Sequence, residues 1–269
     1  MKDLTPVRDE DRFDVERMHQ WLQPFISVDA LPEVQQFRSG ASNLTYLLQY
    51  PDRELVLRKP PVGMKAASAH DMKREFLIQS RLQPVYPLVP SMVAMCDDQS
   101  VMGSDFYVME RVVGDIFRRD VPEGVTPADV SVMADSLING LVKLHAVDAS
   151  ILAELNKGPG YVQRQVEGWS KRYRNALTDD VPNGEKVMAW LEANRPDDVA
   201  SCVIHGDWRI DNVVFNLEQA RIVGVLDWDK NLWCIINDKL SIVSKVGDEL
   251  SVKIIDFEKL VTATFTSDE

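Results

Sequence analysis

The sequence contains little cysteine: three residues, Cys96, Cys202 and Cys234, in a chain of 269. They are too few and too widely spaced for a disulfide framework or a zinc ribbon, so neither kind of scaffold is expected here. An odd number of cysteines also fits a reducing compartment. The cysteine content therefore predicts a cytoplasmic protein whose cysteines act as small buried hydrophobic residues.

Long apolar runs are absent as well. No stretch of about 18 consecutive apolar residues occurs, so no membrane-spanning helix is expected. The N-terminal segment MKDLTPVRDEDRF carries a charge every few residues and has no apolar core, so it is not expected to act as a secretory signal.

Basic residues are in the minority. The chain has 30 Lys and Arg against 42 Asp and Glu, a formal net charge of −12. Nucleic acids and anionic membranes attract proteins with a positive field, so neither is expected as a partner. The remaining composition, 45% hydrophobic and 27% charged, is that of an ordinary globular protein. Small molecules or other proteins are the expected partners.

The first third of the chain has the pattern of a mixed sheet with an inserted helix, and its first three strands are expected to be antiparallel and joined by tight turns. Short apolar runs alternate with turn residues, and two segments repeat apolar residues at helical spacing. We expect helices over residues 12–25 and 70–82, and strands over residues 34–37, 44–50, 55–59, 92–96 and 105–111. The turn-rich segment DDQSVMGS is expected to join the last two strands.

After Gly114 the pattern becomes mostly helical. Thr126, Pro127 and Asp129 are typical of a helix start, and the apolar spacing continues to His145. Two further helices, over residues 161–178 and after Pro182, precede three short β-like runs: SCVIH, NVVF and RIVGVLDW. The change of composition at residues 111–115 predicts two domains, a β-rich lobe over residues 1–111 and a helical lobe over residues 112–269.

One segment carries most of the chemistry. HGDWRIDNVVF, residues 205–215, is followed by VGVLDWD, residues 223–229. Asp207, Asn212 five positions later, and Asp227 at the end of a strand have the spacing of a phosphotransferase active site. Such a site needs one carboxylate to position and deprotonate a hydroxyl, and a carboxamide and a second carboxylate to hold Mg²⁺ against nucleotide phosphates.

These motifs, together with GASNLTYLL, VLRKPP, KREF and MERVVGD, stand in the order found in a known family. Over roughly residues 30–229 the sequence resembles the aminoglycoside phosphotransferase family, the choline-kinase-like and protein-kinase-like small-molecule kinases. It is most similar to the bacterial branch that resembles the kinase-like domain fused to acyl-CoA dehydrogenases. The resemblance implies an α+β, bilobal, protein-kinase-like fold, with an antiparallel N-terminal sheet carrying one helix and catalytic hairpins in a mostly helical C-terminal lobe.

The resemblance also implies roles for residues of the catalytic segment. Asp207 matches the catalytic base that accepts the hydroxyl proton, and His205 matches a residue that orients the loop through hydrogen bonds. Asn212 and Asp227 match the Mg²⁺ ligands, and Asp229 matches an auxiliary ligand. ATP and Mg²⁺ are therefore the expected cosubstrate and cofactor.

The N-terminal lobe is expected to hold the nucleotide. Ser42 and Asn43, in the GASN turn, match a loop over the phosphates, and Glu110 and Val112 match the hinge whose backbone atoms meet the adenine edge. The family's phosphate-binding lysine has no direct counterpart. Alignment places Arg58 there, with Lys59 on the opposite strand face as the alternative. Glu75, on the following helix, is the expected partner of that cation.

The sequence departs from the family after VLDWD. The usual Gly-Asp-Pro segment does not follow, and the atypical tail from about residue 230 has about 40 residues, enough for roughly two helices. The leading hypothesis is an ATP- and Mg²⁺-dependent kinase of a small hydroxylated molecule, either an aminoglycoside, a hydroxyacyl-CoA or another metabolite. A nucleotide-binding pseudokinase or scaffold with an altered acceptor pocket is the alternative. It is also open whether a partner subunit, as in a homodimer, completes the acceptor-binding side of the site.

Overall fold

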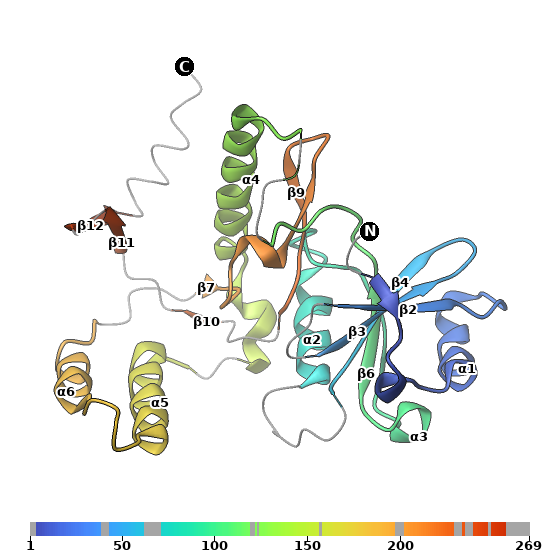
Figure 1. Ribbon diagram of the computed structural model, residues 1–269, viewed down its shortest axis with the longest axis horizontal. Coiled ribbons are helices and arrows are strands. Elements are labelled where there is room, and N and C mark those ends of the chain that lie inside the picture. Colours follow the sequence, from blue (N-terminus) through green and yellow to red (C-terminus); the bar gives the residue numbers. More distant parts are fainter. Residues whose placement is uncertain are drawn as a thin grey trace. The chain divides into compact units, whose positions relative to one another are not determined.

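The computed structural model describes residues 4–38, 43–61, 71–118, 122, 124–155, 158–196, 202–228, 233–234, 239–246 and 249–256 (Figure 1). The chain forms two compact units. The first consists of residues 1–147 and 205–231, and the second of residues 148–204 and 232–269. The lobe boundary at residues 111–112 that the composition favours does not coincide with this division and stays a prediction.

The first unit is built on a six-stranded sheet in the order β1-β2-β3-β4-β6-β5, in which every neighbouring pair is antiparallel. The strands are β1 (Leu4–Pro6), β2 (Glu33–Phe37), β3 (Leu44–Gln49), β4 (Glu54–Lys59), β5 (Met92–Cys96) and β6 (Phe106–Glu110). A tight turn over residues 50–53 joins β3 and β4, as the sequence predicts, and the Tyr50 N–H donates to the Arg53 oxygen across it at 2.9 Å. Strand β1 was not foreseen, because its three residues are too few for a period-two pattern.

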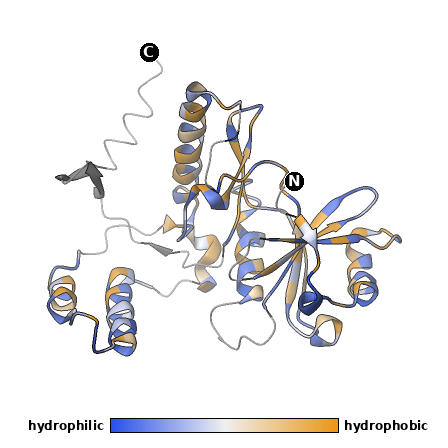
Figure 2. Ribbon diagram, in the orientation of Figure 1, coloured by the Kyte–Doolittle hydropathy of each residue, from blue (hydrophilic) through white to orange (hydrophobic). Residues whose placement is uncertain are grey.

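The two faces of the sheet carry different helices. One face, which includes Tyr46, Leu57 and Phe106, packs against Met18 and Leu22 of α1 (Val15–Ile26). The other face carries the cluster of Val56, Met72, Tyr107 and Met109, in which Met72 comes from α2 (Met72–Leu82). Figure 2 shows the hydrophobic residues along these strands. Because side chains alternate along a strand, Arg58 shares the α2 face with Val56, and Lys59 shares the α1 face with Leu57.

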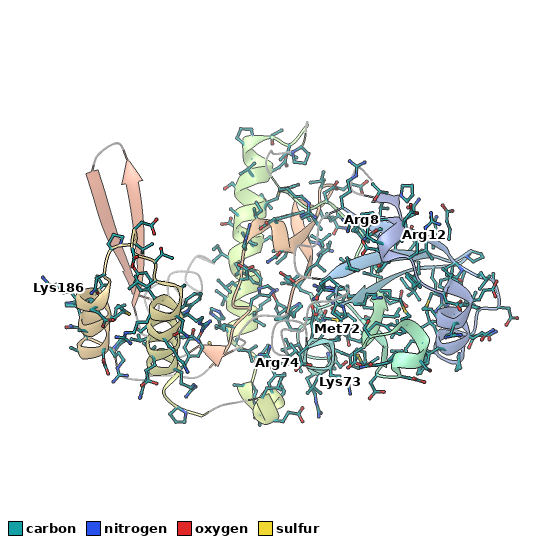
Figure 3. The ribbon with its side chains drawn as sticks, turned by 60° about the horizontal axis from the view of Figure 1, so that its bottom comes forward. Arg8, Arg12, Met72, Lys73, Arg74 and Lys186 are labelled. Atoms are coloured by element: carbon teal, nitrogen blue, oxygen red, sulfur yellow. The ribbon has the colours of Figure 1, made fainter. Side chains whose placement is uncertain are left out.

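Helix α2 begins where its sequence provides a cap. The Asp71 carboxylate accepts a hydrogen bond from the Arg74 N–H at 2.9 Å. Met72 is buried, whereas Lys73 is exposed and pairs with Asp97 at 3.1 Å, so the first turn already separates a core side from a solvent side (Figure 3). One turn further, Glu75 is turned into the interior with 1% of its surface exposed.

The segment DDQSVMGS contains a short helix, α3 (Gln99–Met102), where the sequence pattern indicated only turns. Asp98 caps it by accepting from the Ser100 N–H at 2.9 Å, and Gly103 ends it in the left-handed conformation. The cap and the terminal glycine are visible in the sequence, but four residues are too few to show helical periodicity.

A helix and a hairpin complete the described part of the first unit. Helix α4 (Pro127–His145) begins with the predicted cap, since Thr126 and Asp129 exchange side-chain and backbone hydrogen bonds. Strands β8 (Val213–Asn216) and β9 (Arg221–Val225) form an antiparallel pair that packs against α4. Gly140 of α4 lies against this hairpin, because a Cβ there would overlap Ile222.

The segment that leaves β6 is attached to the same hairpin. Asp115 and Phe215 exchange backbone hydrogen bonds of 2.9 and 2.8 Å. Gly114 leaves room for this pairing, because a Cβ there would overlap the Phe215 backbone. Gly224 does the same for Val112, whose Cγ1 would lie 2.6 Å from an added Cβ. The path of residues 111–115 is therefore set by contact with β8 and β9.

The second unit contains helices α5 (Tyr161–Ala176) and α6 (Glu185–Ala193), which agree with the predicted segments. Arg174 of α5 forms a bidentate ion pair with Glu185 of α6, with both distances 2.7 Å. Strand β7 (Cys202–Val203) pairs with β10 (Trp233–Cys234). Instead of helices, the described part of the tail forms β10 and the hairpin of β11 (Lys239–Val246) and β12 (Glu249–Asp256).

Within the described residues, no single helix has both the length and the apolar character that a membrane crossing needs. Helix α4 and the 3-10 segment Ala149–Leu155 meet that test only when taken together, and only by length and composition.

Candidate active site

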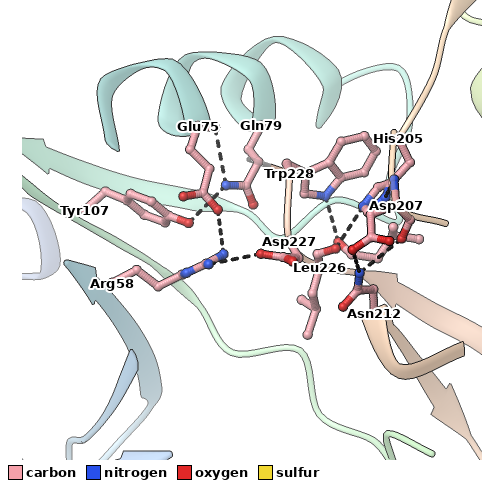
Figure 4. Close-up of polar contacts among 11 residues, drawn as sticks. Arg58, Glu75, Gln79, Tyr107, His205, Asp207, Asn212, Leu226, Asp227 and Trp228 are labelled. Carbon is pink, nitrogen blue, oxygen red and sulfur yellow. Dashed lines mark hydrogen bonds and ion pairs between the residues drawn. The ribbon is translucent and has the colours of Figure 1, made fainter. Parts of the chain in front are cut away.

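The loop that contains Asp207 is held by the side chain of Asn212. The Asn212 amide nitrogen donates to the backbone oxygen of Asp207 at 3.0 Å and to its Oδ2 at 3.3 Å. The Asn212 backbone oxygen accepts from the Leu226 N–H at 2.8 Å, which ties the loop to the end of β9 (Figure 4). Because the amide nitrogen faces Asp207, the Asn212 Oδ1 is the atom that remains for a cation.

His205 connects the same two segments from the buried side. Its Nε2–H donates to the Leu226 oxygen at 2.8 Å, and its Nδ1 accepts the Asp207 backbone N–H at 3.3 Å. Only a neutral ring can donate from one nitrogen and accept at the other. Burial lowers the pKa of His205, although the hydrogen bond to Leu226 opposes this effect. The ring is therefore a tether between the loop and β9.

The lowered pKa of His205 makes the stability of the protein depend on pH. The unfolded state takes up a proton below the ordinary histidine pKa of 6.5, whereas the folded state does so only at lower pH. The stabilising contribution is therefore complete above 6.5 and is lost as the pH falls toward the folded-state pKa. We expect the free energy of unfolding, measured with urea, to fall between about pH 7 and about pH 5.

The variant His205→Asn is expected to show a smaller fall over the same range, because its side chain does not titrate. Burial also lowers the pKa of His145, so part of the dependence should remain in this variant and disappear in a further His145→Gln change. An unchanged pH dependence in His205→Asn would contradict the assignment of a neutral, buried imidazole.

Asp227 lies in an unusual backbone conformation directly after β9. Its φ is +69°, in the left-handed region, which aspartate and asparagine tolerate better than most residues. The next residue, Trp228, is fully buried, and its Nε1–H donates to the Val225 oxygen at 2.8 Å. The anchored indole fixes the turn, and the turn directs the Asp227 carboxylate to Arg58.

Arg58 connects helix α2 with the turn after β9. Its Nη1 donates to Glu75 Oε1 at 2.5 Å and its Nη2 to Asp227 Oδ1 at 3.2 Å. Burial alone would lower the pKa of Arg58, but the neighbouring Tyr107, Glu75 and Asp227 outweigh it, and the net pKa is raised. The guanidinium therefore stays charged between two carboxylates, with its Nε buried and unbonded within the described structure.

Lys59, the alternative cation, lies away from this group. It is buried on the α1 face of the sheet, where its Nζ donates to the Met102 oxygen at 3.5 Å. Burial lowers its pKa. Of the two cations left open by the sequence, Arg58 is the one that the structure brings to Glu75 and Asp227.

The described members of the other nucleotide-site predictions lie near the ends of the inner strands β3 and β6. Glu110 and Val112 are half-buried at the end of β6 and just beyond it, and the Glu110 N–H donates to the Ser91 oxygen at 2.8 Å. Asn43 is buried directly before β3. Ser42 and Asp229 lie outside the described residues. The roles assigned to these residues stay predictions.

Two polar residues near Arg58 were missed by the sequence reasoning. Gln79 and Tyr107 are buried to 2% and 0% exposure beside Glu75. Gln79 follows Glu75 by four positions, and Tyr107 lies directly opposite Arg58 in the pairing of β4 with β6. Both relations could have been found from helical spacing and from strand register, but neither residue type indicates a site by itself.

The donor set fits a magnesium ion that is also bound by phosphates. The described residues contain no group of three or more His, Cys, Asp and Glu side chains arranged to hold a metal alone. Asp227 supplies a carboxylate and Asn212 a carboxamide oxygen. Mg²⁺ is typically held by one or two carboxylates together with substrate phosphates and water, so a dense cluster is not required.

Comparison with known proteins assigns this fold to the kinase-like phosphotransferases. The chain belongs to the Phosphotransferase enzyme family, whose model matches residues 33–232. Both the predicted family and the predicted α+β, kinase-like fold are thereby confirmed.

Three relatives illustrate the range of the similarity. The chain is 37% identical over 236 residues to acyl-CoA dehydrogenase family member 11 of Rattus norvegicus, covering 85% of this chain and 30% of that protein. It is 31% identical to the crystal structure of a candidate aminoglycoside phosphotransferase from Ralstonia eutropha, with a TM-score of 0.71 and coverage of 82% and 66%. The ternary complex of APH(2″)-IIa with streptomycin and ATP shares the fold, with a TM-score of 0.54, 15% identity and coverage of 82% and 72%.

The chain thus spans about 30% of the length of the rat relative. The matched part does not define what the whole of that relative does. The comparisons therefore establish a phosphotransferase family and a kinase-like fold.

Proposed function

We propose that this protein is an ATP- and Mg²⁺-dependent kinase that phosphorylates a hydroxyl group of a small molecule. One observation carries the proposal: the residues proposed as a base, two oxygen ligands and a cation form one connected group, although they come from three segments, the loop 205–212, the turn after β9 and strand β4. The group consists of Asp207, Asn212, Asp227 and Arg58, and Glu75 holds its cation.

The residues present fit the nucleotide and the metal that the family implies. Asp227 and the Asn212 Oδ1 would hold Mg²⁺, and Arg58, with an unbonded buried Nε, would bind phosphate oxygens. When bound, Mg²⁺ neutralises charge on the phosphates. The complex of APH(2″)-IIa with ATP supports nucleotide binding by this fold.

Asp207 is proposed as the catalytic base. Its carboxylate would accept the proton of the acceptor hydroxyl while the hydroxyl oxygen forms a bond to the γ-phosphorus and the bond between that phosphorus and ADP breaks. The Asn212 amide orients this carboxylate through Oδ2, and His205 orients the backbone of the same residue. Catalysis then depends on positioning, to which the buried hydrogen bonds of the loop contribute.

Two acceptor classes follow from the relatives. The names of the structural neighbours favour an aminoglycoside, a cationic acceptor that would suit the net charge of −12. The name of the rat relative favours an acyl-CoA, in which a hydroxyl on the acyl chain would be phosphorylated. An assay panel should contain both.

The proposal is tested by the melting temperature of the wild-type protein with and without Mg²⁺ and ATP. A ligand at about 100 times its dissociation constant stabilises a protein by about 2.7 kcal/mol, which is a shift of several degrees. Transfer of labelled γ-phosphate to members of the panel then tests the reaction. Absence of any shift would overturn nucleotide binding. A clear shift without transfer to any hydroxyl compound would favour the pseudokinase or scaffold.

A further inference from the structure

Four polar side chains are buried together between α2 and the sheet. Side-chain exposure is 11% for Arg58 and 1% for Glu75, and residue exposure is 2% for Gln79 and 0% for Tyr107. Burying charged and polar groups costs free energy unless each group finds its partners. These four side chains can therefore be buried together only in the few conformations in which each polar group has a partner.

The arrangement follows from two regular elements. Glu75 and Gln79 are four residues apart on α2, so both point to the same side of the helix. Arg58 and Tyr107 are directly opposed on antiparallel strands, so both point to the same face of the sheet. Packing of α2 on that face brings the two pairs together, with Phe76 beside the Tyr107 ring at a centroid distance of 6.3 Å.

Hydrogen bonds connect Gln79 with Tyr107 and Arg58 with Glu75 in this group (Figure 4). The Gln79 Nε2 donates to the Glu75 backbone oxygen and to the Tyr107 hydroxyl oxygen, each at 3.3 Å. Because the hydroxyl oxygen accepts from Gln79, the hydroxyl proton is left to be donated to the Glu75 carboxylate. Burial is the largest cause of the raised pKa of Tyr107, and this hydrogen bond to Glu75 raises it further. The same carboxylate accepts from Arg58 at 2.5 Å.

We propose that Tyr107 and Gln79 are positioning residues of the phosphate-binding cation: they fix the Glu75 carboxylate, and Glu75 in turn directs the Arg58 guanidinium to Asp227 and to the nucleotide phosphates. The binding of phosphates by Arg58 rests on the function proposed above. The contact of Tyr107 with the ion pair of Glu75 and Arg58 does not depend on the proposed function.

Fixing Glu75 matters because the side chains of Glu75 and Arg58 both have considerable conformational freedom. An arginine and a glutamate both have several rotatable bonds, and ordering such side chains costs conformational entropy. A tyrosine has a rigid ring, and its hydroxyl here is held by Gln79. Contact with this fixed hydroxyl lowers the number of positions open to Glu75, so the cation is oriented before a nucleotide arrives.

The variant Tyr107→Phe removes the hydroxyl and keeps the ring. We expect the dissociation constant for Mg·ATP, measured by calorimetry well below the melting temperature, to rise about three- to tenfold, as expected for the loss of one buried hydrogen bond. Gln79→Met, which keeps the volume and the helix propensity, is expected to change the same constant in the same direction.

Tyr46→Phe is the matched control. Tyr46 is also fully buried in this sheet, and its hydroxyl donates a single hydrogen bond, to the Asp11 oxygen at 2.9 Å. It lies on the opposite face of the sheet from Arg58. We expect the control to lower the melting temperature and leave the dissociation constant for Mg·ATP unchanged, which separates positioning from stability.

A second measurement uses the protein without nucleotide. If Tyr107 acts on Glu75, Tyr107→Phe should lower the melting temperature less than about half as much in a Glu75→Gln background as in wild type. The reason is that the effects of substitutions at contacting residues are not additive. The pair Tyr46→Phe and Glu75→Gln should be additive.

Equal Mg·ATP affinities in wild type, Tyr107→Phe and Gln79→Met would overturn the inference, as would full additivity of Tyr107→Phe with Glu75→Gln. If Tyr107→Phe does not fold, Gln79→Met decides by the same two measurements. Failure of the wild-type protein to bind Mg·ATP would instead overturn the proposed function, and the nucleotide-free measurement would still test whether Tyr107 acts on Glu75.

Discussion

Asp207→Asn is expected to lower the turnover number for phosphoryl transfer by about 10²- to 10⁴-fold, the usual contribution of a general base. The substitution keeps the shape of the side chain but removes the charge that accepts the hydroxyl proton. Mg·ATP should still bind, because the nucleotide contacts are proposed for Arg58, Asn212 and Asp227. The measurement is the steady-state transfer of labelled γ-phosphate to the best acceptor, beside calorimetric binding of Mg·ATP.

Asp211→Asn is a matched control in the same loop. Asp211 forms an ion pair with Arg209, with distances of 2.7 and 2.6 Å, at the loop surface. Exposed ion pairs contribute little to stability, so this variant should have activity near that of the wild type. If Asp207→Asn retained the turnover number of Asp211→Asn, the assignment of Asp207 as the base would be wrong.

Asp227→Asn is expected to raise the dissociation constant for Mg·ATP at least about tenfold, which corresponds to about 1.4 kcal/mol. The change removes the carboxylate proposed to bind Mg²⁺, which is also the negative partner of the Arg58 Nη2. Asparagine is the appropriate replacement because the backbone here has a φ of +69°. Alanine would add strain of about 1–2 kcal/mol at that angle and would mix loss of stability with loss of binding.

The measurement is the melting temperature at increasing ATP, with Mg²⁺ and with a chelator. In wild type, chelation should remove most of the ATP-dependent shift, whereas in Asp227→Asn the two series should nearly coincide. Asp52→Asn, an exposed turn residue next to Arg53, is the control and should behave as wild type. A full Mg²⁺-dependent shift in Asp227→Asn would show that the metal is held elsewhere.

The use of arginine at position 58 has a structural reason. One ammonium group presents its charge at a single point, whereas the two Nη atoms of Arg58 reach two carboxylates at once. Glu75 belongs to α2, and Asp227 belongs to the turn after β9. Arg58 therefore links the sheet, helix α2 and the turn that contains Asp227, and a lysine at this position could serve only one of the two carboxylates well.

Several elements could be predicted from the sequence because the pattern that encodes them is local. Asp71 and Thr126 cap α2 and α4 through hydrogen bonds to residues three positions away. The helix α3 and the strand β1 escaped prediction because such short elements show no periodicity. The described part of the tail is the clearest miss, since its length suggested helices and it forms the strands β10, β11 and β12.

In the site, too, local relations could be predicted from the sequence and distant ones could not. The relation of Asp207 to Asn212 is contained in a loop of a few residues, so its hydrogen bonds follow from the local spacing. The choice between Arg58 and Lys59 could not be made locally. Alternation assigns them to opposite faces of β4, but only the packing of α2 and α1 on the two faces decides which one meets Glu75.

By itself, the sequence indicated the phosphotransferase family through its resemblance to known proteins. It also predicted the order of the main strands and helices and the closeness of Asp207 and Asn212, because short spacings along a chain constrain geometry directly. Only the tertiary structure decided which cation meets Asp227, since Arg58 precedes it by 169 residues. It also decided that Tyr107 and Gln79 lie buried beside Glu75. Their residue types are ordinary in a core, and the register of β6 on β4 and the packing of α2 bring them to the site.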